Sequence, residues 1–509
     1  MNDLFLLYGP PRSGKTTIGR LLAERLDLPF VDLDARLAEQ AGRPLSALRQ
    51  GESEASFRGR ETAALRQAAS DGRGVVALGD GALLAPLNRG LAEDAGVVLC
   101  LEPGPETAAD AGAGDAPGAP ARRPDPFSEH YASFPRRLAV APGVPEENAD
   151  AAQIAMGAFR VRGMGAAYDV RVGAGRLDDL GALLAARGWQ GRAVIAGDEH
   201  TLPEYGRRAL QALEQAGIET RTCRLPAGEA HKTIETVQAL WRSFLEARLE
   251  RSDTVVALGG GVVGDLAGFA ASTWLRGVRW VGLPTTLLAM ADSSLGGKTG
   301  ADLPQGKNLV GAFHPPALVV ADTDTLVSLP DAELRAGLAE AVKHGIIADP
   351  ELFDQCAEGF DSLRQEMSAE FVSRAMAVKI RTIERDPYEK GERAGLNLGH
   401  TVGHGIEKAA RFTLRHGEAV AMGLVAEARL AERMGLAHAG LADLIAGVLA
   451  GLGLPAAIPA GIDRRVVAEA IQLDKKRAGG VVRFALPVRI GEVRTGVAVD
   501  PALLAEVLG

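Results

Sequence analysis

The chain has 509 residues, 24% of them charged, and its 56 basic and 65 acidic side chains give a formal charge of −9. That length suffices for about three domains with separate cores, and the mild acidity gives no electrostatic reason to bind nucleic acid or an anionic membrane. Three scattered cysteines exclude a disulfide framework and a cysteine-based zinc site. The N-terminus lacks the features of a secretion signal, so we expect a cytoplasmic protein.

A phosphate-binding loop opens the chain. An apolar run over residues 4–8 leads into Gly9-Pro-Pro-Arg-Ser-Gly-Lys-Thr16, which matches G-x-x-x-x-G-K-[ST], and a helical pattern follows over residues 17–23. In this motif backbone amides surround the phosphates, Lys15 reaches the β- and γ-phosphates, and Thr16 ligates Mg²⁺. The first part of the chain is therefore predicted to bind ATP.

Two later stretches of this part have unusual compositions. Residues 102–126 are almost entirely Ala, Gly, Pro and Asp, which predicts a loop or lid without a packed core. Residues 141–150 are rich in Pro, Gly and Glu and are predicted to form an interdomain linker.

The segments after the phosphate loop resemble shikimate kinase. Phe30-Val-Asp-Leu-Asp34, Phe57-Arg-Gly-Arg-Glu61 and Ala77-Leu-Gly-Asp-Gly81 stand in that family's order and spacing. The resemblance implies shikimate contacts from Asp34, Arg58, Gly79, Gly81 and Arg136 or Arg137, Mg²⁺ held by Thr16 and Asp32, and ATP bound by Gly9, Ser13, Gly14, Lys15, Thr16, Thr17 and Arg123. The family's three-glycine turn is Gly-Asp-Gly here, which places Asp80 beside an anionic substrate. A non-catalytic nucleotide-binding module is therefore the alternative.

The middle of the chain alternates β-rich runs with helical patterns. The runs cover residues 192–196, 254–258, 280–283 and 318–321, a rhythm that indicates a parallel α/β sheet. The apolar tract 254–274 contains Asp265 and several glycines, which favours a strand, loop and helix over a membrane span. Gly259, Gly261 and Gly264 satisfy G-x-G-x-x-G, but the usual acidic residue about 20 positions later is absent. Spacing alone leaves nucleotide binding open there, with Asp198 as a candidate for the ribose.

Histidines cluster in the last, mostly helical part. His400 and His404 lie on one helical face, His416 follows after a short break, and Glu340 is a candidate third ligand. Two imidazoles and a carboxylate suit Zn²⁺ with an open position, although capped or solvent-facing histidines are the alternative. Cations and asparagines around the cluster predict a substrate that carries phosphate and carboxylate.

Residues 168–490 resemble 3-dehydroquinate synthase over nearly their whole length. The matching stretches are 227–232, 259–265, 274–277, 284–298, 306–308, 340–343, 397–404, 416–418 and 474–477. The whole chain therefore resembles a fusion of two shikimate-pathway enzymes. We expect an α/β fold with a P-loop kinase-like parallel α/β domain (1–145), a Rossmann-like α/β NAD domain (154–330) and a mostly α-helical metal- and substrate-binding domain (331–509).

This second resemblance implies a full set of site residues. Zn²⁺ or Co²⁺ would be held by Glu340, His400 and His416, with His404 near the substrate phosphate. NAD would contact Asp198, Glu229, Lys232, Gly260, Gly261, Val262, Asp265, Thr285, Thr286, Lys298 and Lys307. The phosphate would contact Lys298, Asn308, Asn397, Lys475 or Lys476, and Arg276 from the partner subunit of a homodimer. Lys379 and Arg393 suit the carboxylate, and Asp292, Lys343 and Glu389 suit hydroxyl positioning and proton transfer.

The implied reaction converts 3-deoxy-D-arabino-heptulosonate 7-phosphate into 3-dehydroquinate. Transient oxidation at C5 by NAD⁺ precedes β-elimination of phosphate, re-reduction, ring opening and an intramolecular aldol closure. A polyol dehydrogenase, a sugar-phosphate cyclase whose substrate has no carboxylate, and a nucleotide-sensing scaffold are the alternatives. Lys379 with Arg393 argues against the first two, and the histidine cluster argues against the third.

Overall fold

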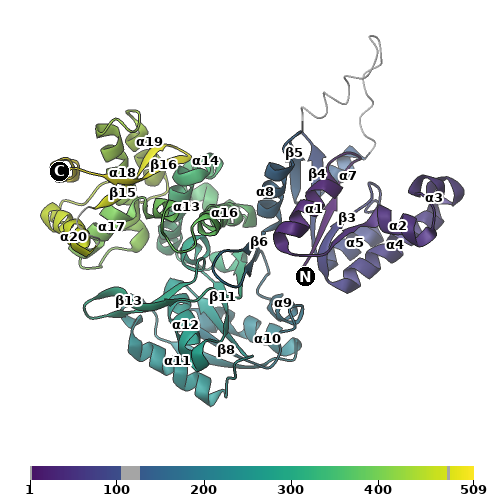
Figure 1. Ribbon diagram of the computed structural model, residues 1–509, viewed down its shortest axis with the longest axis horizontal. Coiled ribbons are helices and arrows are strands. Elements are labelled where there is room, and N and C mark those ends of the chain that lie inside the picture. The colour runs from purple at the N-terminus through teal and green to yellow at the C-terminus, as the bar shows by residue number, and fades with distance from the viewer. Residues whose placement is uncertain (1–2, 105–126, 478–481) are drawn as a thin grey trace, which may run out of the picture.

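A computed structural model describes residues 3–104, 127–477 and 482–509 of the chain. Figure 1 shows an N-terminal α/β part, a central α/β part and a C-terminal helical part. The candidate lid beyond residue 104, with Arg123, lies outside the described residues. Within the described ranges, every helix is too short or too polar to cross a membrane.

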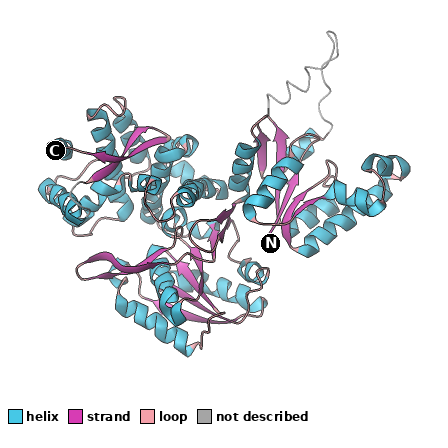
Figure 2. Ribbon diagram, viewed as in Figure 1, coloured by secondary structure: helices cyan, strands magenta, loops and turns pink. Residues whose placement is uncertain are grey.

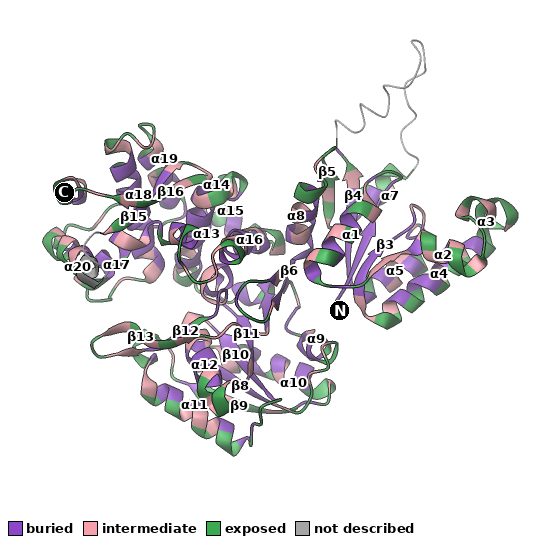
Figure 3. Ribbon diagram, in the orientation of Figure 1, coloured by how far each residue is buried: buried purple, intermediate pink, exposed green. Residues whose placement is uncertain are grey.

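The N-terminal part is a five-stranded parallel sheet in the order β2-β3-β1-β4-β5. All six residues of the central strand β1 are buried, as expected for a parallel strand covered on both faces (Figures 2 and 3). The strands are β1 (Asp3–Tyr8), β2 (Phe30–Asp32), β3 (Arg73–Ala77), β4 (Val97–Pro103) and β5 (Arg137–Val140). The helices are α1 (Lys15–Leu26), α2 (Leu33–Ala41), α3 (Leu45–Gly51), α4 (Glu54–Asp71), α5 (Pro86–Ala95) and α7 (Ser128–Ala132).

The linker predicted over residues 141–150 is wrong in its second half, because helix α8 (Pro145–Met156) begins there. Pro145 occupies the first turn, where a missing N–H costs nothing, and Glu146 and Glu147 complement the helix dipole. The same residue types that suggested a linker are thus helix-start signals. Helix α8 packs against α1 on one side and against α16 (Ala369–Arg385) of the C-terminal part on the other.

The central part is a seven-stranded sheet in the order β6-β7-β14-β11-β10-β8-β9, parallel except for β6. The four predicted runs lie in β8 (Arg192–Asp198), β10 (Thr254–Gly259), β11 (Arg279–Pro284) and β14 (Leu318–Asp322). The sheet also contains β6 (Ala158–Val161), β7 (Tyr168–Gly173) and β9 (Glu219–Leu225). The helices are α9 (Leu180–Ala185), α10 (Arg207–Gln215), α11 (Ile234–Glu246) and α12 (Gly261–Thr273), and β12 (Lys298–Leu303) and β13 (Gly306–Phe313) form a separate hairpin. Strand order reverses between β8 and β10, and the ends of such strands are where α/β sheets bind ligands.

The C-terminal part is helical, as predicted, with one addition. Its helices are α13 (Asp331–Ala348), α14 (Pro350–Ala357), α15 (Phe360–Glu366), α16, α17 (His400–Ala409), α18 (His416–Arg433), α19 (Leu441–Gly451), α20 (Arg464–Arg477) and α21 (Pro501–Leu508). The prediction missed the antiparallel hairpin of β15 (Arg483–Arg489) and β16 (Glu492–Ala498), which turns at Gly491 (φ 84°).

Glycines bring the helices of this part together at the site. A Cβ on Gly423 of α18 would lie 2.0 Å from the Gly399 carbonyl oxygen before α17, and one on Gly417 would lie 2.1 Å from the Ala336 carbonyl oxygen of α13. A larger residue would therefore force α17 or α13 away from α18. These contacts place the first residues of α17 and α18 next to the middle of α13.

A buried ion-pair network joins the N-terminal part to the central part. Asp3 of β1 accepts hydrogen bonds from Arg171 of β7 and from Arg187 (Nη2, 2.8 Å), and Asp169 also pairs with Arg187. Asp3 and Arg171 are at most 1% exposed. Buried charges persist only when paired, so this network fixes the junction between the two sheets.

Candidate functional site

Two histidines and a carboxylate converge where α13, α17 and α18 meet. The Nε2 atoms of His400 and His416 lie 3.6 and 3.7 Å from Oε1 of Glu340. That oxygen is buried and accepts no hydrogen bond, and one ligand atom from each residue lies within 4.8 Å of the others. Such an arrangement matches the His and carboxylate donors that Zn²⁺ or Co²⁺ prefers.

Both imidazole rings are held through their other nitrogen. Nδ1 of His400 is 3.1 Å from the Leu398 carbonyl oxygen, and Nδ1 of His416 is 3.5 Å from Oε1 of the buried Glu407. Metal-binding histidines usually donate their second N–H in this way, which fixes the tautomer and leaves Nε2 free for the ion. The three predicted ligands therefore fit a divalent cation. The sequence reasoning missed Glu407, although it lies three residues after His404 on the same helix.

The charges at this cluster favour a cation. Burial raises the pKa of Glu340, but Lys343 and the two imidazoles outweigh it and hold the pKa well below the ordinary value. Burial lowers the pKa of His416, but the nearby carboxylates of Glu340 and Glu407 prevail and raise it to about 10. Burial and Lys343 lower the pKa of His400 to about 3, so this imidazole is a neutral donor.

The predicted catalytic residues surround the cluster. Lys379 of α16 donates to the carbonyl oxygen (2.7 Å) and to Oδ1 (2.6 Å) of Asp292, which lies in a π-helical turn. Lys343 pairs with Glu340, and its Nζ lies 3.9 Å from Asp292. Asp292 and Glu340 also group with the buried His344 within 4.8 Å. The ammonium groups, the carboxylates and the proposed ion position thus form one continuous polar centre.

A second group of predicted residues lies at the rim of this centre. Glu389 pairs with Lys298 and accepts from the side-chain amide of Asn397 (3.0 Å). Its backbone is left-handed (φ 57°), a costly conformation that concentrates at functional sites. Arg393 donates to the Pro387 carbonyl oxygen, and its guanidinium lies so close to Gly296 that a Cβ there would be 2.5 Å from Nη2.

The predicted nucleotide residues meet at the reversal point of the central sheet. Asp198 ends β8. Gly260 separates β10 from α12, which begins at Gly261, next to the turn that holds Thr285 and Thr286. A Cβ on Gly261 would lie 2.9 Å from Oγ of Ser293. The N-cap residue of α12 is Gly260, which offers no side-chain cap, so the first amides of the helix can receive a phosphate group. Val262 lies in that first turn.

The β12–β13 hairpin links the nucleotide residues to the metal cluster. Lys232 pairs with Asp265 (2.6 Å) and donates to the side chain of Asn308 (2.6 Å). Lys307 lies 3.3 Å from Glu229 and 3.8 Å from Glu407. Lys307 thus contacts a nucleotide residue and a residue of the metal cluster, and Asn308 contacts the nucleotide residue Lys232.

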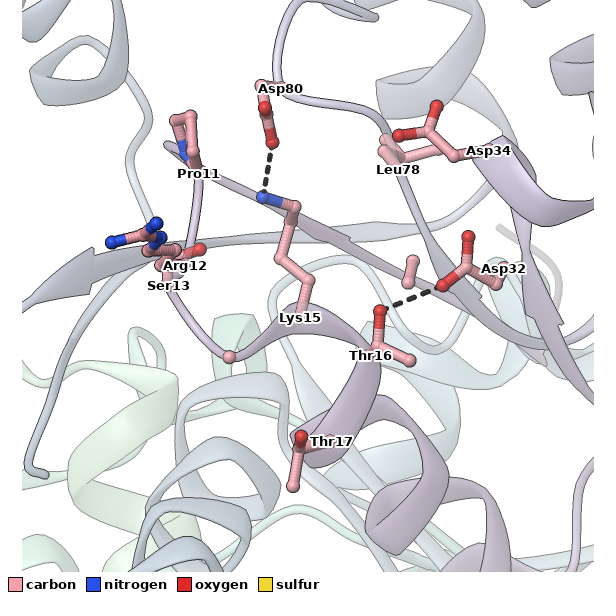
Figure 4. A pocket seen from close by; sticks show the side chains of 12 residues that line it. Pro11, Arg12, Ser13, Lys15, Thr16, Thr17, Asp32, Asp34, Leu78 and Asp80 are labelled. Atoms are coloured by element: carbon pink, nitrogen blue, oxygen red, sulfur yellow. Dashed lines mark hydrogen bonds and ion pairs between the residues drawn. The ribbon is translucent and has the colours of Figure 1, made fainter. Parts of the chain in front are cut away.

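The phosphate loop lines a cavity of about 380 Å³ together with Asp32, Asp34 and Asp80 (Figure 4). Lys15 donates to the carbonyl oxygens of Gly9 and Pro10 and to Oδ1 of Asp80, each at 2.8 Å. Those three acceptors use all three protons of its ammonium group. Ser13, Gly14 and Thr17 also line the cavity.

Thr16 donates its hydroxyl proton to Asp32 at 2.8 Å, so the two residues predicted to hold Mg²⁺ lie next to each other. Asp34 and Arg58 lie against the turn of Gly79 and Gly81, where a Cβ would meet them at 2.6 and 2.7 Å. Arg58 is paired with Glu54 and Glu61. Arg136 is half-buried just before β5, and burial together with the charge of Arg176 lowers its pKa.

A few predicted residues stand apart. Arg276 is exposed after α12 with a left-handed backbone (φ 69°). The side chain of His404 is 59% exposed, with its ring 5.4 Å from that of His400. Lys475 and Lys476 lie in α20, and their side chains are outside the described part of the structure.

Comparisons with known proteins match the first part of the chain to one enzyme family and the remainder to another. Residues 222–336 match the family described as 3-dehydroquinate synthase N-terminal, residues 337–477 match 3-dehydroquinate synthase C-terminal, and residues 11–123 match shikimate kinase. A 3-dehydroquinate synthase of Symbiobacterium thermophilum is 48% identical over 64% of this chain and 92% of its own length. One from Nostoc punctiforme is 43% identical over 67% and 96%.

Solved structures of related cyclases share the fold of the last two parts. A 2-deoxy-scyllo-inosose synthase bound to carbaglucose-6-phosphate, NAD⁺ and Co²⁺ has a TM-score of 0.63 and 26% identity, covering 69% of this chain and 99% of its own. The 2-epi-5-epi-valiolone synthase of Streptomyces hygroscopicus, with NAD⁺ and Zn²⁺ bound, has a TM-score of 0.63 and 29% identity over 69% and 98%.

Proposed function

The chain belongs to the 3-dehydroquinate synthase family, and we propose that it converts 3-deoxy-D-arabino-heptulosonate 7-phosphate into 3-dehydroquinate and phosphate with NAD and Zn²⁺ or Co²⁺ bound. The observation that carries the cofactor requirement is the set of Glu340, His400 and His416. Their donor atoms face one point, and Glu340 offers that point an oxygen without a hydrogen bond. The solved structures of related cyclases with NAD⁺ and Co²⁺ or Zn²⁺ bound support the same pair of cofactors.

When bound, the divalent ion would polarise substrate oxygens and NAD⁺ would accept a hydride for part of each turnover. The surrounding residues have roles that follow from their contacts. Lys379 and Arg393 supply two cations for the substrate carboxylate, and Arg393 can bind it with two parallel hydrogen bonds. Lys298 and Asn397, both held by Glu389, suit the phosphate.

Proton transfer falls to the buried carboxylate and ammonium groups. Asp292 is shared between Lys379 and Lys343, whose side chains are at most 8% exposed. Burial lowers the pKa of Lys379 despite the nearby carboxylate, which makes its proton easier to release than that of an ordinary lysine. Asp292 then holds the hydroxyl side of the substrate between these two lysines.

A cyclase acting on a substrate without a carboxylate is the second candidate, because 2-deoxy-scyllo-inosose synthase shares the fold. The pair of Lys379 and Arg393 favours the heptulosonate, because the buried Arg393 guanidinium donates to a neutral acceptor, the Pro387 carbonyl oxygen, and a substrate carboxylate would give it a counterion. The higher identity to 3-dehydroquinate synthases supports the same choice.

We assign the N-terminal part an ATP-dependent shikimate kinase activity. The match to that family and the lysine, threonine and aspartate side chains around the phosphate loop support it. A homodimer in which Arg276 reaches the partner's site, in the cytoplasm, completes the proposal. The exposure of Arg276 is compatible with that role.

One coupled assay tests the synthase. The protein is incubated with NAD⁺, Zn²⁺ and the heptulosonate phosphate, and phosphate and NADH are followed together. Stoichiometric phosphate without net NADH supports the synthase, whereas net NADH indicates a dehydrogenase. Glu340→Gln should abolish phosphate release and lower metal content, while Glu370→Gln, on the exposed first turn of α16, is the control.

The kinase is tested by ADP formation with shikimate present and absent. Wild-type protein should form ADP only with shikimate, and Lys15→Ala should not. Equal ADP formation with and without shikimate would contradict the assigned acceptor.

A further inference from the structure

Helix α17 begins at the metal ligand His400 without a cap of its own. Its N-cap residue is Gly399, which has no side chain to accept from the exposed amides of the first turn. Those amides need acceptors from elsewhere when the helix end is buried. The position of His400 therefore depends on what satisfies this end of the helix.

Close packing against α18 explains the glycine. Gly399 is left-handed (φ 78°), and a Cβ there would lie 2.8 Å from the Leu424 side chain and 3.0 Å from the Val420 carbonyl oxygen. A serine or aspartate, the usual N-cap residues, would clash at this position. The cap has to come from another element.

Glu427 of α18 supplies it. Its Oε2 accepts from the Gly399 amide (2.5 Å), and its Oε1 accepts from the Val402 amide (3.1 Å). The residue is 0% exposed, so the carboxylate serves the helix end rather than solvent. Its two oxygens bind the amides on both sides of His400, one before it and one after it.

We propose that Glu427 is a positioning residue of the metal centre, which fixes the start of α17 so that Nε2 of His400 faces Glu340. This inference rests on the proposed metal-dependent function. His400 Nδ1 is held by Leu398 and the backbone next to it by Glu427, so the ring has little freedom. Metal ligation tolerates displacements of only about 0.2 Å, so a small shift of this helix end weakens the site.

The same helix offers a matched control. Glu432 of α18 accepts from the Ala442 amide (2.9 Å) at the start of α19, which also has a glycine N-cap without a side-chain bond. Helix α19 carries none of the predicted site residues. Glu427→Gln and Glu432→Gln thus disturb two helix caps of one kind, only one of which borders a metal ligand.

Full-length protein is stripped of metal, and its Zn²⁺ affinity is measured by competition with a chromogenic chelator. The visible absorption of the Co²⁺-loaded protein reports the ligand geometry. Gln at position 427 puts an NH₂ group against a backbone N–H, so we expect 10- to 100-fold weaker Zn²⁺ binding and an altered Co²⁺ spectrum. Glu432→Gln should stay within about twofold of wild type.

Glu427→Asp keeps the carboxyl group on a side chain one methylene shorter, and it replaces the Gln variant in the experiment if that variant does not fold. We expect it to weaken Zn²⁺ binding about tenfold. Equal affinities and spectra in wild type and in folded variants at position 427 would overturn the inference. A selective loss of affinity in protein that releases no phosphate would support it and contradict the proposed reaction.

Discussion

The ion-pair network between β1 and β7 allows a quantitative prediction for Asp3→Asn. The side chain of Asp3 is 0% exposed and accepts from Arg171 and Arg187, so the variant leaves two buried guanidinium groups with Asp169 as their remaining carboxylate. Removing one partner of a buried pair costs about 3–5 kcal/mol. We expect about 3 kcal/mol, because Asn keeps one acceptor and Asp169 remains. For a domain of about 150–250 residues, a loss of about 3 kcal/mol corresponds to a fall in Tm of roughly 6–12 °C.

The assay is urea and thermal denaturation followed by circular dichroism. Glu506→Gln is the control, since Glu506 pairs with Arg433 at the surface and its loss should cost under about 1 kcal/mol. A loss for Asp3→Asn no larger than for the control would refute the assignment of this network to stability.

The same variant has a predictable pH dependence. Burial raises the pKa of Asp3, but Arg171 and Arg187 outweigh it and hold the pKa below the ordinary range. A depressed pKa in the folded state contributes stability above the unfolded value of about 4, and that contribution is lost as pH falls. The gap in unfolding free energy between wild type and Asp3→Asn should therefore narrow below about pH 4, and a constant gap would contradict this account.

Three further changes test the two sites. Asp80→Asn removes the carboxylate that competes with nucleotide phosphates for Lys15, a half-exposed pair worth about 1 kcal/mol, so ATP measured by calorimetry should bind about fivefold tighter. Glu407→Gln removes the carboxylate facing Nδ1 of His416 and should weaken Co²⁺ binding about tenfold in a chelator competition. Gly423→Ala puts a Cβ 2.0 Å from the Gly399 carbonyl oxygen and should cost about 1–3 kcal/mol in urea denaturation.

Each of these three predictions has a control variant or a result that would contradict it. Asp71→Asn, on the exposed end of α4, should leave ATP affinity unchanged, and unchanged affinity for Asp80→Asn as well would contradict the competition. If Glu407→Gln binds Co²⁺ as tightly as wild type, the proposed role of Glu407 in holding His416 is contradicted. Gly447→Ala, with no atom within 4 Å of the new Cβ, should not destabilise the protein, and equal effects of the two alanines would contradict the packing argument.

The sequence by itself determined the features whose signal is local. The phosphate loop, the helical face of His400 and His404, and four parallel strands of the central sheet follow from spacing and composition within short windows, and the structure places them as predicted. The assignment of Glu340, His400 and His416 needed the family resemblance as well, because nothing in their spacing distinguishes Glu340 from other buried glutamates.

The tertiary structure alone decided the contacts between distant segments. Glu407 and Glu427 carry no motif and act only because α17 and α18 approach closely at glycines. Helix α8 replaced an expected linker, since its apolar side has α1 and α16 to pack against. Helix and loop propensities differ by less than about 1 kcal/mol per residue, whereas burial of one large apolar side chain contributes about 2 kcal/mol, so packing partners far away in sequence decide such segments.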